Sequence, residues 1–148
     1  MTALELAALR QLISRVLRHQ AQAGSATGAA AVAAAARGAY DDLARVLVPL
    51  IGQVGTEVLA ARAVHLAQRE YPWLAKTRDP KHAQGPFTHV SFSLEHQDPA
   101  LATEGAAAVL AAFTGLLITF IGEPLTTRLM RKAWPDGFSD AGAKETRA

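Results

Sequence analysis

The stretch that decides the fold is GAAAVLAAFTGLLITFIGEPLTTRLMRKAW, which runs from Gly105 to Trp134. Its first eighteen residues, 105–122, contain no charged side chain. Glu123 and Pro124 follow, and several basic residues come shortly after them. An uncharged run of this length is typical either of a membrane span or of a buried central helix in a soluble bundle.

Small residues follow one side of the helix that this run predicts. They recur at spacings of three and four residues, as expected for one stripe of a helix: Gly105, Ala108, Ala112, Gly115, Thr119 and Gly122. Such a seam of small residues lets a second helix backbone approach closely, in a bilayer or in water. The seam therefore predicts close helix packing without choosing between the two environments.

Length and flanking sequence favour the buried helix. A membrane span needs ~20 mostly apolar residues, and the run 105–122 contains several alanines, two threonines and an interior glycine. The amphipathic N-terminal helix also needs an apolar surface to cover. A protein of the inner membrane that spans the bilayer over 105–122 is the alternative, because Arg128, Arg131 and Lys132 suit a cytoplasmic flank as well as a helix C-terminus.

The composition predicts an all-α fold. Of the 148 residues, 50% are hydrophobic but only 6% are aromatic. Alanine and leucine, both strong helix formers, supply most of the apolar content. We expect one helical domain over 1–138, a bundle of four or five helices with an apolar central helix, followed by a polar, flexible tail over 139–148.

Local signals place the predicted helices. Thr2 and Glu5 form a capping box before the first helix. Pro49 predicts that the second helix kinks or stops there, and Asp98 followed by Pro99 predicts a capped helix start. The predicted helices cover residues 3–22, 27–47, 53–71, 99–122 and 125–134.

One long irregular segment, about 76–98, interrupts this helical pattern. Within it, the sequence FTHVSFSL (87–94) alternates apolar and polar residues. A period of two predicts an extended segment or a short strand, or else a long ordered loop. A lone strand has no partner within one copy, so pairing with a second copy is a further interpretation.

Several classes of function have no support in the sequence. The net charge is only +2, and the basic residues form no dense run, so no nucleic-acid partner is expected. The chain has no cysteine, which excludes a thiol nucleophile and Cys-based metal sites. Phosphate-binding loops and hydrolase motifs are missing. His82, His89 and His96 recur every seven residues, which is no known ligand spacing, so neither a metal nor a cofactor is expected.

Two pairs of polar residues are the weaker site candidates. His65, four residues before Arg69, is either a phospho-accepting histidine or a histidine at a helix interface. The lysine and glycine that usually follow a phosphotransfer histidine are absent, which favours the interface. Glu123 either caps the final helix or forms a buried ion pair with Arg128 or with an arginine of 53–71.

The sequence favours a non-catalytic interaction or regulatory module that self-associates, most simply as a dimer, in a bacterial cytoplasm. A second, different protein partner is also compatible with it. The alternatives are a small membrane-associated protein and a signalling bundle that carries phosphate on His65. The absence of catalytic motifs favours a protein that is not an enzyme.

Overall fold

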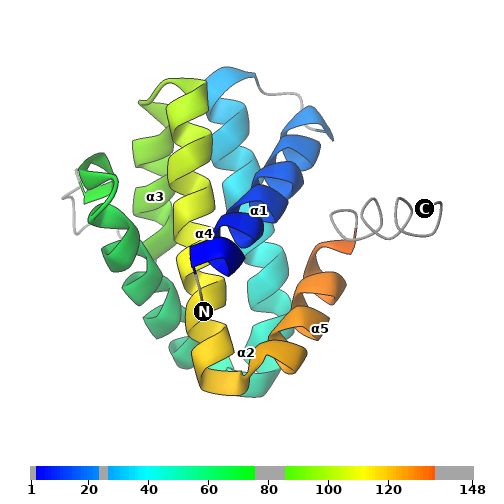
Figure 1. Cartoon of the computed structure of the whole chain (residues 1–148). Helices are drawn as coiled ribbons and strands as arrows, with labels where there is room; N and C mark the ends of the chain where they lie inside the picture. The colour runs from blue at the N-terminus through cyan, green and yellow to red at the C-terminus, as the bar shows by residue number, and fades with distance from the viewer. Residues whose placement is uncertain (1–2, 24–26, 76–85, 136–148) are drawn as a thin grey trace.

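The computed structural model describes residues 3–23, 27–75 and 86–135. These ranges form helices and no strand, which confirms the predicted all-α bundle. Thr2, residues 76–85 of the predicted irregular segment and the predicted tail 139–148 lie outside the described residues. The elements are α1 (Ala3–Ala23), α2 (Gly28–Gln68), the 3-10 helix η1 (Pro72–Ala75), α3 (Pro86–Glu95), α4 (Pro99–Ile121) and α5 (Glu123–Ala133) (Figure 1).

Helix α4 is the apolar central helix that the sequence predicts. It contacts α1, α2, α3 and α5, and Leu110, Phe113 and Leu117 on it are fully buried. It begins as predicted, because the Asp98 side chain accepts a hydrogen bond from the Ala100 amide at 3.1 Å and Pro99 occupies the first turn. A carboxylate at this position satisfies an amide that has no partner within the helix.

The predicted strand at 87–94 is wrong, because α3 spans Pro86–Glu95 as a helix. Val90, Ser93 and Leu94 are buried, and their spacing of three and four residues is helical. The helix packs on α2 and η1, where the Ser93 hydroxyl donates to the Leu74 carbonyl at 3.4 Å. The alternation of apolar and short polar residues over 87–94 is compatible with a helix as well as with a strand. Packing of the buried positions against α2 and η1 stabilises the helix.

The predicted break at Pro49 is also wrong. Helix α2 continues through Pro49 and reverses at Gly52, whose φ of 83° and ψ of 165° are not helical. Proline removes one amide donor, but only glycine adopts such a positive φ without steric strain. The reversal divides α2 into a first arm, 28–51, and a second arm, 53–68, which correspond to two of the predicted helices.

A second reversal of the same kind joins α4 to α5. Gly122 has φ 90° and ψ 156°, close to the values at Gly52. At both junctions a buried threonine hydroxyl donates to the glycine carbonyl at 2.8 Å, from Thr56 to Gly52 and from Thr126 to Gly122. The sequence Ile-Gly-x-x-x-Thr thus occurs twice, at 51–56 and 121–126. We call these two reversals the glycine junctions.

Both glycine junctions lie at the same, lower end of the molecule in Figure 1. The first arm of α2 and helix α4 run in the same direction and in contact. At their starts, a Cβ on Gly28 would lie 4.0 Å from Pro99 Cγ. Further along, the rings of Tyr40 and Phe113 are 5.7 Å apart. The two helices therefore also end level with each other.

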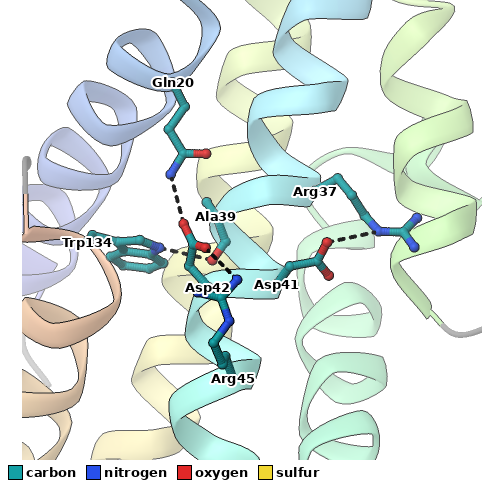
Figure 2. A network of polar contacts seen from close by, with 7 residues as sticks. All are labelled: Gln20, Arg37, Ala39, Asp41, Asp42, Arg45 and Trp134. Carbon is teal, nitrogen blue, oxygen red and sulfur yellow. Dashed lines mark hydrogen bonds and ion pairs between the residues drawn. The ribbon is translucent and has the colours of Figure 1, made fainter. Parts of the chain in front are cut away.

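A buried tryptophan at the C-terminal end of α5 forms a hydrogen bond with the first arm of α2. The Trp134 indole N–H donates to the Ala39 carbonyl at 2.9 Å (Figure 2), and its side chain is 2% exposed. Next to it, the Gln20 amide of α1 donates to Asp42 at 3.5 Å, and Arg45 lies 3.4 Å from the same carboxylate. These contacts tie α1, α2 and α5 together above the glycine junctions.

We expect Gly52→Ala and Gly122→Ala each to lower the free energy of unfolding by about 1–2 kcal/mol, because a Cβ is strained at positive φ. Gly55→Ala is the matched control: Gly55 lies inside the second arm, and its added Cβ would make ordinary contact, 3.5 Å, with Ile51. That variant should be neutral or stabilised by up to about 1 kcal/mol. Urea denaturation followed by circular dichroism measures all three, and equal stability of Gly52→Ala and Gly55→Ala would contradict the account.

An ion pair connects α1 to the residues that follow the end of α2. The two terminal guanidinium nitrogens of Arg10, Nη1 and Nη2, donate to the Glu70 carboxylate at 2.9 and 2.8 Å. The hydrogen bonds from Arg10 hold the pKa of Glu70 below its ordinary value, and those to Glu70 raise the pKa of Arg10. A depressed carboxyl pKa stabilises the fold above the unfolded-state pKa and loses that effect as the pH falls through the folded value.

We therefore expect Glu70→Gln to lower the free energy of unfolding at neutral pH by less than about 1 kcal/mol, because the Glu70 side chain is 50% exposed and screened by water. The difference from the unsubstituted protein should begin to shrink as the pH falls below 4.5, the ordinary glutamate pKa, and should disappear below the lowered pKa of the folded state. It should also shrink in about 1 M salt. Thermal denaturation across this pH range checks it. A difference that persists in acid would show that Glu70 acts by packing rather than by charge.

Candidate functional site

Four large apolar side chains are exposed among the residues that the structure describes. Leu50 is 54% exposed, Val54 72%, Val58 60% and Phe120 68%. We call these four residues the apical surface. Scattered exposed apolar residues are ordinary on a soluble protein, but a group gathered in one place marks an interaction site.

The glycine junctions position this surface. Leu50 lies two residues before Gly52, and Phe120 lies two residues before Gly122. Because the first arm of α2 and α4 end level, the turns that carry Leu50 and Phe120 lie at the same end of the bundle. Val54 and Val58 follow on the second arm, one turn apart and on its outer side, since Thr56 and Ala60 of that arm are buried.

Few charges border the apical surface. Residues 46–56 and 105–122 carry none. Beyond these runs come Glu57, which accepts a hydrogen bond from the Gln53 amide at 3.2 Å, and the exposed Glu123 and Arg128 of α5. The exposed apolar residues thus lie in or beside uncharged stretches of the chain, and charges of both signs come next to these stretches. This arrangement is common in protein–protein contacts.

The predicted seam of small residues divides into two parts. Its N-terminal part is buried, and a Cβ on Gly105 would collide with the Trp73 ring, so glycine makes room for the indole. Ala108 is also buried. Ala112 and Gly115 are half-buried, Thr119 is exposed and donates to the Gly115 carbonyl at 3.1 Å, and Gly122 ends the helix.

The polar candidates lie at two separate places. His65 and Arg69 are exposed near the end of the second arm of α2, toward the opposite end of the molecule from Gly52, and His65 lies two turns beyond Val58. Glu123 belongs to the first turn of α5 without a side-chain capping bond, because Gly122 is the capping residue. Glu123 and Arg128 are both exposed, so neither is a buried charge. The role of His65 as a phosphate acceptor stays a prediction.

The cavities of the described chain do not suggest chemistry. One of about 560 Å³ lies between α1 and α4, where Arg15 and Arg18 face Glu104 and where Arg10 is paired with Glu70. Another, of about 320 Å³, is lined by His19, Asp42, Arg45 and Lys132. Both linings have more cationic than anionic side chains, but each contains a carboxylate, and Arg10 at the larger cavity is already paired with Glu70. Within the described residues, no group of three or more His, Asp or Glu side chains is placed to hold a metal ion.

Comparison with known proteins adds no family. No protein-family model, curated protein or solved structure matches the chain. The exposed apical surface is thus the feature of the molecule that indicates a function. The sequence reasoning missed this surface, although the repeated Ile-Gly-x-x-x-Thr pattern at 51–56 and 121–126 is visible in the sequence and marks both junctions.

Gly105 offers a test of the packed part of the seam. We expect Gly105→Ala to destabilise the protein by about 1–3 kcal/mol, because the added methyl group overpacks against the Trp73 ring. In a Trp73→Ala background the same substitution should cost much less, since the obstructing ring is gone. Urea denaturation of the four proteins measures this coupling. Additive effects of the two substitutions would mean that the contact does not constrain Gly105.

Proposed function

We propose that this protein is a non-catalytic helical interaction module that works as a homodimer in the bacterial cytoplasm. The apical surface carries the proposal. Its four exposed apolar side chains lie at one end of the bundle, beside runs without charge. Solvent exposure of such a cluster is unfavourable, and covering it with a second copy removes that surface from water.

The size of the surface favours a weak dimer. Four exposed side chains of this size present on the order of a few hundred Å² of apolar surface, well below the ~800 Å² that each partner buries in a stable interface. Buried area does not convert directly into affinity, because association costs an estimated ~4–15 kcal/mol in lost freedom of motion before side-chain ordering. A surface of this size therefore fits a weak, reversible dimer, with a dissociation constant of about micromolar or above.

Membrane association is the second candidate, and one observation favours it. Helices α2 and α4 both contain windows long and apolar enough to cross a bilayer, and the window in α2 is only 22% buried within the bundle. The window in α4 is 56% buried, as in the core helix of a soluble protein. Glu57, Glu123 and Arg128 border the apical surface, so its edge lacks the cluster of Lys and Arg that anionic lipids attract. We therefore propose that a second copy of the chain, and not a lipid bilayer, covers the apical surface.

Sedimentation velocity without detergent tests the proposal, at protein concentrations from about 1 to 200 µM, the range in which a weak dimer of this affinity forms. We expect the mass to rise with concentration from 15.6 kDa toward twice that value. A constant mass of one chain across the range would overturn the proposal. Recovery of the protein only with membranes, and its sedimentation with lipid vesicles, would favour the membrane candidate instead.

A further inference from the structure

We propose that the cavity between α1 and α4 binds a small zwitterion, either a free amino acid or a short peptide. In this arrangement Arg15 and Arg18 of α1 bind the carboxylate of the ligand, and Glu104 of α4 binds its ammonium group. We call this site the α1–α4 cavity. It contains no residue of the apical surface, and the proposal does not depend on the homodimer.

The α1–α4 cavity has a size suited to a small organic ligand. Its volume of about 560 Å³ lies within the range of about 300–1,000 Å³ that is usual for ligand sites. Along its α1 wall, Arg10 and Arg18 lie about two helical turns apart, or about 12 Å. About three residues of an extended peptide span a similar length, at about 3.5 Å each, so the cavity has room for one to three residues.

The α1 wall supplies two unpaired cations. Arg15 and Arg18 are exposed and line the cavity. Within the described part of the chain, neither arginine forms an ion pair. A guanidinium group presents its N–H donors in the planar arrangement that carboxylates bind, and the neighbouring Ser14 hydroxyl is a further polar group of this wall. The α1 wall therefore favours a carboxylate.

The third arginine of this wall is already occupied. Arg10 donates to both carboxylate oxygens of Glu70, through Nη1 and Nη2. Arg10 and Glu70 thus neutralise each other, and the pair adds no net charge to the cavity. The charges of Arg15, Arg18 and Glu104 are left to select the ligand.

The α4 wall supplies one carboxylate. Glu104 is exposed, lines the same cavity and forms no ion pair with a described residue. Burial is the main cause that raises the pKa of Tyr71, and the negative charges of Glu70 and Glu104 raise it further. Tyr71, which also lines the cavity, is therefore uncharged at neutral pH. Glu104 carries the charge of this wall and favours an ammonium group.

Opposite charges on the two walls select a ligand that carries both. A simple anion bound to Arg15 and Arg18 is repelled by Glu104, and a simple cation at Glu104 is repelled by the two arginines. A zwitterion gives each wall a partner of opposite charge, and it displaces no ion pair of the described residues. Because exposed ion pairs each contribute little, we expect a dissociation constant on the order of millimolar.

A series of glycine peptides tests the charge pattern. Glycine, diglycine and triglycine carry the same two charged ends at increasing separation, whereas acetate and methylammonium each carry one. Each probe is titrated into 15N-labelled protein at constant ionic strength while amide chemical shifts are followed. At least one zwitterion should bind about threefold more tightly than either single-charge probe, with the largest shifts at cavity residues such as Gln11, Ser14 and Ala107. Tightest binding of glycine would indicate a free amino acid as ligand, and tightest binding of a longer probe a peptide.

Substitutions on the two walls separate a zwitterion site from an anion site. Arg15→Gln and Glu104→Gln should each raise the dissociation constant of the tightest zwitterion by about two- to fivefold, because each removes one charged partner. Both positions are exposed, so both variants should keep the helical circular dichroism of the unsubstituted protein. The matched controls are Arg62→Gln and Glu95→Gln, the same changes at exposed positions that do not line the cavity, and they should leave binding unchanged.

Three results would each overturn the proposal. The first is no binding of the three zwitterions up to about 50 mM, well above the expected dissociation constant. The second is binding of acetate, methylammonium or inorganic phosphate as tight as that of the tightest zwitterion, since one charge is then sufficient. The third is binding that Arg15→Gln and Glu104→Gln weaken no more than their controls do, since the two walls then do not hold the ligand.

Discussion

The positive φ angles of Gly52 and Gly122 are the constraint on which the rest of this structure depends. As one uninterrupted helix, α2 with its 41 residues would extend about 60 Å, too long for a bundle of this size to cover. The two reversals instead return the second arm of α2 and helix α5 along the bundle. At each reversal a threonine hydroxyl donates to the glycine carbonyl, and at Gly122 that carbonyl also accepts the Thr126 amide at 3.1 Å, so the first turn after the reversal is held by two hydrogen bonds.

The same reversals create the exposed apolar surface. Where the chain reverses direction at the end of a helix, some side chains of the last helical turn stay exposed. The segment that follows packs along the side of the bundle and does not cover its end. Leu50 and Phe120 are in this position, and the neighbouring runs lack the charges that usually occupy such turns. Above the junctions, the Trp134 hydrogen bond to Ala39 and the ion pair of Arg10 with Glu70 fix the outer helices. The bundle is thus secured along its length, and its uncovered apolar residues lie at one end.

Much of the fold follows from the sequence, and little of the candidate site does. Alanine- and leucine-rich composition predicts the helices, and the uncharged run predicts α4 as the centre. Asp98 and Pro99 predict its start, because capping depends only on neighbouring residues.

The strand predicted at 87–94 fails because Val90 and Leu94 fit a helical face as well as a strand, and contacts with α2 and η1 decide between them. The break predicted at Pro49 fails because the proline is compatible with the last turn of the arm, whereas the reversal requires glycine. The apical surface depends on which side chains the folded arms leave uncovered, and no local pattern records that.

The most direct measurement of the central claim is intermolecular disulfide formation between introduced cysteines, since the chain has none of its own. Copies carrying Phe120→Cys are oxidised under mild conditions, beside copies carrying Gln11→Cys on the exposed side of α1 as a control. Association through the apical surface predicts covalent dimers that form faster with Phe120→Cys than with the control. Cross-linking of Phe120→Cys no faster than that of the control would contradict the account.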